Sequence, residues 1–218
     1  MSESRFARLE DVVLDDAFPE VDLVLRRGRH VGRDDGEQYT FLVDAQDHLE
    51  PFYRRYGCEL VHKSDGYFYL LPTTERLGRR HLSLVEMLVG QALALRYLDP
   101  EVVETGGVVS RDDVLAHLAG VVGAEALVKL LNPKLRRRQD EAIAAHNVRS
   151  RVDGALRKLA ALGFVEALPD ARFRLRAPLL RFAEPLRGAD SPEAQLAALA
   201  AAGEVVVGDA LDEEDTSE

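Results

Sequence analysis

Basic side chains gather in one part of this chain, between residues 134 and 187. That segment holds 13 Lys and Arg against 6 Asp and Glu, a local balance of +7. The whole chain has a net charge of −10, so the remaining residues carry −17. Lysine and arginine neutralise phosphate groups, and a basic island in an acidic chain is typical of a nucleic-acid-binding surface.

Part of the basic island falls on a predicted helix over residues 139–162. Apolar residues recur there at helical spacing: Val148, Val152, Ala155, Leu156, Leu159 and Leu162. At about 100° per residue, one stripe flanks that apolar face and consists of Asn147, Arg151, Gly154 and Lys158. Small and basic residues alternate along the stripe, which would let the helix approach a phosphate backbone closely.

A predicted β-hairpin follows this helix and adds further arginines. Residues 164–168 and 172–176 are strand-like runs on either side of Pro169-Asp170-Ala171, a turn signal. In the second run Arg172, Arg174 and Arg176 alternate with apolar residues. Because side chains alternate between the two faces of a strand, we expect one face to pack and the other to carry three guanidinium groups.

The helix and the hairpin together predict a DNA-binding surface. Its candidate residues are the basic side chains and one amide of the island: Lys134, Arg136, Arg137, Arg138, Asn147, Arg149, Arg151, Lys158, Arg172 and Arg174. No pattern among them demands contacts with base edges, so we expect binding to double-stranded DNA without sequence preference. The alternative is a solvated charged face, which Asp140, Glu141 and Asp153 would favour.

Catalysis has little support in the sequence. The six histidines are scattered and Cys58 is the single cysteine, so no metal-ligand spacing is present. Gly28 and Gly32 are not followed by the Lys-Ser/Thr of a phosphate loop, and residues 34–37 suit a solvated turn. We therefore expect no catalytic residue, no metal and no cofactor.

The location of the protein follows from similar arguments. A single cysteine suits a reducing compartment, and the first residues lack the apolar segment of a signal peptide. No run approaches the ~20 apolar residues of a membrane span. We expect a cytoplasmic protein without a membrane partner.

A unit of helix, glycine and hairpin occurs twice, about a hundred residues apart. In the first copy Gly57 follows an amphipathic helix, and strand-like residues 58–62 and 67–71 flank a turn with Asp65-Gly66. In the second copy Gly163 takes the place of Gly57, and Val108-Val109 could add a third strand. The repeat predicts two tandem winged-helix domains in a mainly α fold with small β-hairpins, an α+β class. We place the first domain at residues 1–78, the second at 79–188, and a C-terminal helix with an acidic tail at 189–218.

Two further helices carry expectations of their own. The helix of the first copy has no Lys or Arg between residues 37 and 53 but exposes Asp44, Asp47 and Glu50, so we expect it to contact protein rather than DNA. Pro51 should kink that helix or mark a fresh start. Residues 82–98 are apolar nearly all round, which predicts burial between the domains or in a dimer interface.

The amino-acid sequence of the first copy also resembles that of a known family. The motifs that carry the likeness are Leu25-Arg26-x-Gly28-Arg29-His30-x-Gly32, Phe41-Leu42-x-Asp44-x-Gln46-x-x-Leu49-Glu50-x-Phe52-Tyr53-x-Arg55-Tyr56 and Gly66-Tyr67-Phe68-Tyr69-Leu70-x-Pro72. They resemble the MukE family of accessory subunits of the bacterial MukBEF condensin. The likeness continues in order through Leu156-x-x-Leu159-x-x-Leu162-Gly163 and Glu193-Ala194-Gln195.

The resemblance implies a non-enzymatic, tandem winged-helix homodimer that supports chromosome condensation and segregation at the nucleoid. Its implied partners are the kleisin MukF, the SMC ATPase MukB through MukF, and DNA. The residues that would meet the kleisin are not indicated. Two alternatives stay open: a MukE-like subunit of a plasmid-restricting condensin, and a stand-alone winged-helix transcription regulator.

Overall fold

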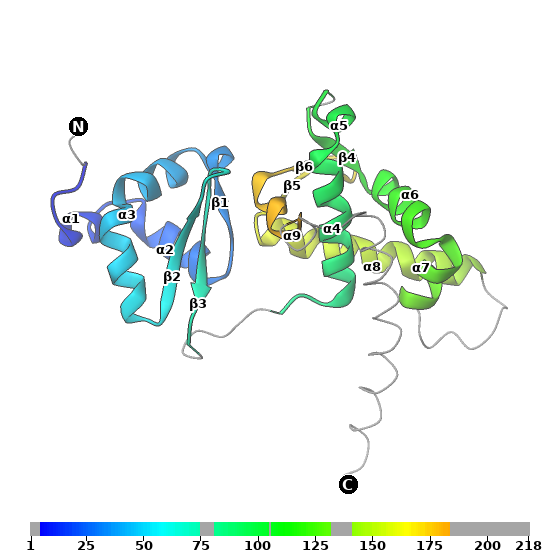
Figure 1. The fold of residues 1–218 in the computed structure, drawn as a ribbon, viewed down its shortest axis with the longest axis horizontal. Helices are drawn as coiled ribbons and strands as arrows, with labels where there is room; N and C mark the ends of the chain where they lie inside the picture. The colour runs from blue at the N-terminus through cyan, green and yellow to red at the C-terminus, as the bar shows by residue number, and fades with distance from the viewer. Residues whose placement is uncertain (1–4, 75–80, 105, 132–140, 184–218) are drawn as a thin grey trace, which may run out of the picture. The chain divides into compact units, whose positions relative to one another are not determined.

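The computed structural model describes residues 5–74, 81–104, 106–131 and 141–183, which form two compact units (Figure 1). Unit 1 consists of Met1–His81 with two short segments from later in the chain, Ala161–Phe164 and Arg176–Pro178. Unit 2 consists of Leu82–Ala160, Val165–Leu175 and Leu179–Glu218. The expected C-terminal helix and acidic tail, residues 189–218, lie outside the described residues.

Unit 1 places three helices against a small sheet. Its elements in chain order are α1 (Leu9–Val13), α2 (Phe18–Arg26), β1 (Val31–Gly32), the 3-10 turn η1 (Arg33–Asp35), α3 (Glu37–Arg55), β2 (Cys58–Lys63) and β3 (Tyr67–Pro72). The strands are antiparallel in the order β1-β3-β2. The hairpin expected at residues 58–71 is confirmed, whereas β1 falls outside the strand-like runs expected from the sequence.

The core of unit 1 is built on the inner face of α3. Phe41, Leu42, Ala45, Leu49 and Tyr53 recur at helical spacing and are fully buried. They pack against the sheet, of which Phe68 is also fully buried, and Cys58 lies in the same cluster as a small core residue. The Tyr53 hydroxyl donates a hydrogen bond to Asp22 of α2 over 3.1 Å, so the polar end of this buried ring is satisfied.

Helix α3 runs through Pro51 as one helix, so the expected fresh start at that residue is wrong. Proline lacks the N–H that would bond the carbonyl of Asp47. Both Pro51 and Asp47 are exposed, so water can satisfy that carbonyl on the outer face of the helix.

Unit 2 has more helix and a second small sheet. Its elements are α4 (Leu84–Leu98), α5 (Pro100–Glu104), β4 (Val108–Ser110), α6 (Arg111–Val122), α7 (Ala124–Leu131), α8 (Glu141–Ala161), β5 (Val165–Leu168), β6 (Arg172–Leu175) and α9 (Leu180–Ala183), with a 3-10 turn, Ala177–Leu179, assigned to either side of the unit boundary. The strands are antiparallel in the order β4-β6-β5. Both the hairpin and the third strand at Val108-Val109 are confirmed.

The apolar helix α4 is buried by elements of its own unit. Seven consecutive residues, 88–94, are buried, and α4 packs against α5, α6 and α9. Gly90 lies so close to the ring of Phe182 in α9 that an added Cβ would stand 2.5 Å from it. The burial predicted for this helix is confirmed for residues 88–94, which elements of the same unit cover, whereas Leu98 at its end is 56% exposed.

The two units repeat one local arrangement. Helix α3 of unit 1 is followed by Gly57 at φ 73°, and helix α8 of unit 2 is followed by Gly163 at φ 79°, a residue that is assigned to unit 1. After each glycine comes a hairpin whose second strand lies in the middle of its sheet. A left-handed residue after the last helical turn satisfies the final carbonyl groups, and glycine takes that conformation without strain. The expected α+β class, mainly helical with small antiparallel sheets, is confirmed.

Candidate nucleic-acid interface

Helix α8 positions most of the predicted DNA-binding residues that the structure describes. Its apolar face is buried as its spacing predicts, from Val148 and Val152 through Leu156 and Leu159 to Leu162 just beyond its end. Burial of this face fixes the rotation of the helix, so residues on the opposite arc point outward. The angle around the helix axis between an arginine and the buried Val152 therefore decides whether that arginine can reach a phosphate.

One flank of α8 carries basic groups with no ionic partner among the described residues. Arg151 is exposed, and Asn147, Gly154 and Lys158 on the same stripe are half-exposed. No ion pair joins Arg151 or Lys158 to a side chain that the structure describes. A Cβ added at Gly154 would meet nothing within 4 Å, so the helix surface is open at that point. Arg157, which is not among the sequence-based candidates, is exposed and likewise has no ion pair within the described part of the chain.

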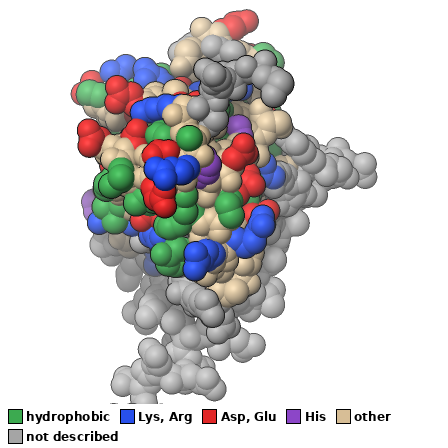
Figure 2. All heavy atoms as spheres, turned by 90° about the vertical axis from the view of Figure 1, so that its left-hand side faces the viewer, with side chains coloured by type: hydrophobic (Ala, Val, Ile, Leu, Met, Phe, Trp, Pro, Cys, Tyr) green, Lys and Arg blue, Asp and Glu red, His purple; other side chains and the backbone are tan. Residues whose placement is uncertain are grey.

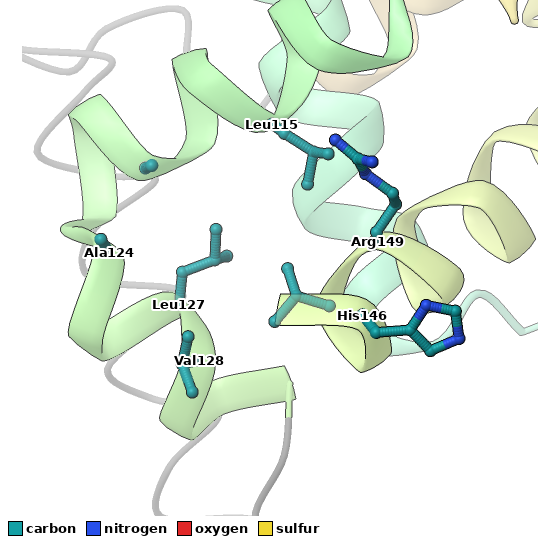
Figure 3. Close-up of a pocket in the computed structure, with 8 residues that line it drawn as sticks. Leu115, Ala124, Leu127, Val128, His146 and Arg149 are labelled. Atoms are coloured by element: carbon teal, nitrogen blue, oxygen red, sulfur yellow. The ribbon is translucent and has the colours of Figure 1, made fainter. Parts of the chain in front are cut away.

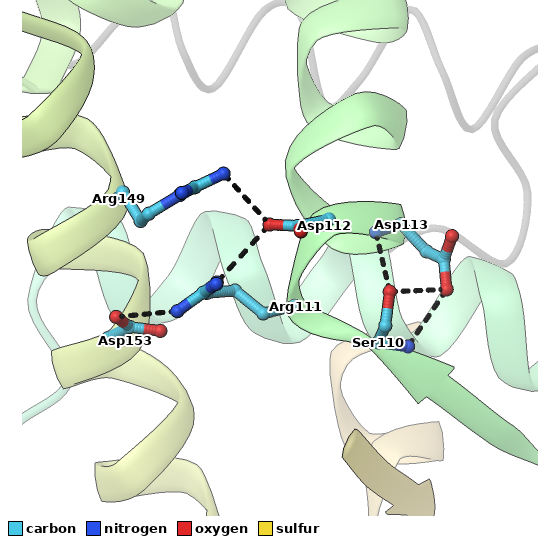
Figure 4. A network of polar contacts seen from close by, with 6 residues as sticks. All are labelled: Ser110, Arg111, Asp112, Asp113, Arg149 and Asp153. Carbon is cyan, nitrogen blue, oxygen red and sulfur yellow. Dashed lines mark hydrogen bonds and ion pairs between the residues drawn. The ribbon is translucent and has the colours of Figure 1, made fainter. Parts of the chain in front are cut away.

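Arg149 lies on the other flank of the helix, away from this stripe. It is two residues from Arg151, which places the two side chains about 160° apart around α8. Its Nη2 donates to Oδ1 of Asp112 at the start of α6 over 3.1 Å (Figure 4). Arg149 is thus a member of the predicted set that the structure separates from the stripe.

The Asp112 carboxylate also accepts a hydrogen bond from a second arginine, Arg111. Arg111 donates from Nε to Oδ1 of Asp112 over 3.3 Å and from Nη1 to Asp153 of α8 over 3.4 Å. The hydrogen bond to Asp112 raises the pKa of the Arg111 guanidinium. Arg111 is absent from the sequence-based candidates, because it lies outside the basic island at residues 134–187. Two arginines and two carboxylates therefore form one network between α6 and α8 (Figure 4).

Beside this network, Ser110 and Asp113 cap the start of α6. The Ser110 hydroxyl donates to Asp113 over 2.7 Å, and it accepts from the Asp113 backbone N–H over 3.1 Å. The Ser110 backbone N–H donates back to the Asp113 carboxylate over 2.9 Å. This reciprocal cap satisfies two backbone donors, and the Ser110 side chain above all holds the pKa of Asp113 below its ordinary value.

The hairpin arginines are exposed but paired. Arg174 faces Glu166 across the hairpin, with 2.9 Å between Nη1 and Oε2, and Arg172 lies 3.8 Å from Asp170. Exposed pairs of this kind contribute ~0–1 kcal/mol, so these carboxylates lower the local charge without fixing the arginines firmly. Both side chains are presented to solvent as predicted.

Arg176 is buried, so the expectation of three exposed guanidinium groups on the hairpin is wrong. It belongs to unit 1, is 9% exposed, and its Nη1 lies 3.0 Å from Oδ1 of Asp35. Asp35 also accepts from Arg29 over 2.7 Å and from the Gly32 backbone N–H over 2.9 Å. The turn at residues 34–37 is therefore not fully solvated, because the 7%-exposed carboxylate of Asp35 joins two cations inside unit 1.

Four of the predicted residues, Lys134, Arg136, Arg137 and Arg138, lie outside the described residues.

In the part that is described, a hollow of about 510 Å³ opens beside Arg149 (Figure 3). Leu115, Ala119, Ala124, Leu127, Val128 and Val148 line it with apolar groups, and His146 and Arg149 complete the lining.

Unit 1 offers no comparable basic surface on its corresponding helix. Asp44, Asp47 and Glu50 lie on α3 with half-exposed or exposed side chains, as predicted. Arg5 approaches Asp44 at 3.8 Å, and Gln46 donates to Glu50 over 2.7 Å. The face of unit 1 in Figure 2 mixes acidic, basic and apolar side chains.

One exposed histidine of unit 1 is held in place from several sides. His62 on β2 stacks on Phe68 with 3.9 Å between ring centroids, and it shares hydrogen bonds with Gln46 and Tyr39. Partial burial above all lowers the pKa of His62. Its contacts are those of a structural side chain on the surface of the sheet.

The described residues, 5–74, 81–104, 106–131 and 141–183, also bear on metal binding and membrane insertion. Within those ranges no group of three or more His, Cys, Asp or Glu could hold a metal ion. Of the helices described, none is long and apolar enough to cross a membrane.

Comparison with known proteins decides the family. The model of the MukE-like family matches residues 6–218. The chain belongs to the MukE-like family. Among its relatives, the chromosome partition protein MukE of Histophilus somni is 36% identical over 213 residues, which cover 95% of this chain and 84% of that protein.

Two other relatives of the same name give similar figures. The chromosome partition protein MukE of Haemophilus ducreyi is 35% identical over 195 residues, covering 87% of this chain and 81% of the relative. The protein from Escherichia coli O157:H7 is 33% identical over 192 residues, covering 86% and 84%. The resemblance to the MukE family in the motifs of unit 1 is therefore confirmed over nearly the whole chain.

Proposed function

We propose that this chain is a non-enzymatic subunit of a bacterial SMC–kleisin condensin of the MukBEF type. The observation that carries the proposal is the family match over residues 6–218, together with relatives named chromosome partition protein MukE. In this role the chain binds the kleisin MukF, joins the SMC ATPase MukB through MukF, and supports chromosome partition. It acts in the cytoplasm at the nucleoid, as a homodimer.

The proposed architecture is two winged helices in tandem. In each unit a short strand comes before the helix that leads into the hairpin, with α6 and α7 between that strand and α8 in unit 2, and in each sheet the second hairpin strand is central. This order of elements suits the winged-helix motif, in which the helix before the hairpin faces DNA or protein. We propose residues 1–78 and 79–188 as the two domains.

Double-stranded DNA, bound without sequence preference, is the proposed ligand of unit 2. Arg151, Arg157 and Lys158 support this assignment, because they are the basic groups of α8 without an ion pair to any described side chain. Their guanidinium and ammonium groups suit phosphate oxygens. The stripe that holds Arg151 and Lys158 has a single amide, Asn147, and no carboxylate, so it offers no row of such groups for reading base edges. Arg172 and Arg174 on the hairpin would extend the contact to neighbouring phosphates.

Unit 1 is the proposed protein-binding unit. The acidic outer face of α3 would repel a phosphate backbone, since like charges raise the free energy of association. Asp47 and Glu50 lie on the same helix as the family motif that runs from Phe41 to Tyr56.

The proposal is tested by recovering the chain from its native cytoplasm with its partners. We expect a tagged chain to bring down a kleisin and an SMC-type ATPase in stoichiometric amounts. Recovery of neither protein would overturn the condensin role. If the purified chain instead bound one short DNA sequence far more tightly than others, a transcription regulator would explain it better.

A further inference from the structure

Arg111 and Arg149 converge on a single oxygen atom from two different helices. Arg111 Nε lies 3.3 Å and Arg149 Nη2 lies 3.1 Å from Oδ1 of Asp112 (Figure 4). Two guanidinium groups aimed at one anionic oxygen are the arrangement that binds a phosphate oxygen. In this structure the anion is supplied by the chain itself.

We propose that Asp112 is an internal counter-ion that competes with DNA phosphate for Arg111 and Arg149. This inference rests on the proposed DNA binding of unit 2 and deepens it, because it adds a second contact with DNA, on the flank of α8 that carries Arg149, and names the residue that limits its affinity. When a backbone phosphate approaches, the two arginines exchange Asp112 for the phosphate oxygen. No covalent change is involved.

The exposure of the groups makes the exchange feasible. The side chains of Asp112 and Arg149 are 64% and 53% exposed, so neither is held in a buried pocket. Pairs exposed to this degree are weak and are screened by salt. DNA, by contrast, presents a dense row of phosphates, and the release of its condensed counterions makes the free energy of binding more favourable.

The second contact of Arg111 keeps one of the arginines in place during the exchange. Asp153 of α8 lies 3.4 Å from Arg111 Nη1, and its side chain is 27% exposed. Arg111 itself is 25% exposed. Asp153 therefore holds the guanidinium between α6 and α8 after Asp112 has been displaced, which leaves Arg111 Nε directed toward the incoming oxygen.

The test measures binding of the full-length chain to a fluorescent duplex DNA of arbitrary sequence at a series of NaCl concentrations. The variant Asp112→Asn keeps the shape of the side chain and removes its charge. We expect it to bind ~3–10-fold more tightly than the wild type and to show a steeper salt dependence, by about 1–2 in the log–log slope, because up to two more phosphates are neutralised.

Two further variants separate a local effect from a change in net charge. Glu125→Gln removes one exposed carboxylate from α7 that forms no ion pair with a described residue, and it should alter binding by less than twofold. Adding Arg111→Gln and Arg149→Gln to Asp112→Asn should abolish the gain. Asp112→Ser repeats the test if Asp112→Asn is poorly folded, and thermal unfolding of each variant checks its fold.

The outcomes distinguish this inference from the proposed function. If the wild type binds DNA and Asp112→Asn binds no more tightly, the role of Asp112 is overturned and DNA binding stands. The same holds if Glu125→Gln raises the affinity for DNA as much as Asp112→Asn does. Absence of binding by both the wild type and Asp112→Asn would overturn the DNA-binding proposal and the inference together. Binding by Asp112→Asn alone would support the inference in its strongest form.

Discussion

The helix before the hairpin has the same place in both units, yet the two copies differ in charge. Helix α3 of unit 1 directs Asp47 and Glu50 outward, whereas α8 of unit 2 directs Arg151 and Lys158 outward. Their buried faces are alike in pattern, and each helix is followed by a glycine with positive φ. The apolar face and the cap therefore set the architecture, while the residues on the outward arc of the helix are free to change and so to select a different partner.

The glycines that follow the two helices differ in what surrounds them, and this predicts the largest effect. A Cβ at Gly163 would collide with the backbone carbonyl of His30, whereas at Gly57 it would meet the side chain of Thr74. Alanine at positive φ costs roughly 1–2 kcal/mol, and a clash that forces the backbone to move adds ~1–3 kcal/mol. We expect Gly163→Ala to lower the free energy of unfolding by ~3 kcal/mol and Gly57→Ala by ~1–2 kcal/mol, as measured by urea denaturation. Equal losses would show that the two caps are equivalent.

The difference in charge predicts the next largest effect, on DNA binding. Reversing Arg151 and Lys158 together to Glu should weaken binding to arbitrary duplex DNA by ~10–100-fold and flatten its salt dependence, because each lost phosphate contact removes about 0.9 from the slope. The matched control in unit 1 is Arg54→Glu with Arg55→Glu, two exposed arginines at the end of α3, for which we expect little change. An unchanged salt slope in the α8 variant would remove those residues from the site.

The starts of helices α6 and α3 differ, because α6 has the Ser110 side-chain cap and α3 begins after Gly36, which has none. The Ser110 cap predicts a smaller effect that depends on pH. Ser110→Ala removes the side-chain cap of α6, which should cost ~1 kcal/mol near neutral pH. The Ser110 hydrogen bond depresses the pKa of Asp113 in the folded state. Its contribution is therefore present above the unfolded pKa of ~4 and is lost as pH falls through the lower folded value.

The destabilisation by Ser110→Ala should accordingly be larger at pH 7 than at pH 2–3, as denaturant unfolding at the two pH values would measure. The part due to the Asp113 backbone N–H would remain at acid pH, because that group does not titrate. A loss that is the same at both pH values would mean that the Asp113 carboxylate is not stabilised by Ser110.

The turns of the two hairpins predict the smallest effect. Unit 1 turns with Gly66 at φ 85°, but unit 2 places Asp170 at φ 60° and Ala171 at φ 53°. Ala171→Gly should relieve about 1 kcal/mol of backbone strain in the folded state. Most of this stabilisation is offset, because glycine has greater conformational freedom in the unfolded chain. We expect a net stabilisation of ~0.5 kcal/mol or less by thermal unfolding, whereas Gly66→Ala should destabilise. Loss of stability in Ala171→Gly would contradict the strain assigned to this turn.

Much of the fold could be predicted from local patterns. The face from Val148 to Leu162, the cap at Gly163 and the two hairpins depend on spacing and turn residues within about ten positions. The strand β1 was missed because two residues, Val31 and Gly32, are too few for an alternating pattern and are paired by Phe68 and Tyr67 from far along the chain. Burial of α4 was foreseen, but α9, which covers it, is only four residues long.

The sequence by itself determined that α8 is amphipathic, that its stripe is basic, and that the first copy carries the motif of the MukE-like family. Only the tertiary structure decided which arginines remain without a carboxylate partner in the described chain. Asp112 meets Arg149 from 37 positions away and Asp35 meets Arg176 from 141 positions away. Such pairs depend on which helices and turns are brought together, and Coulomb attraction falls off over a few ångströms in water and salt, so charge along the chain does not reveal them.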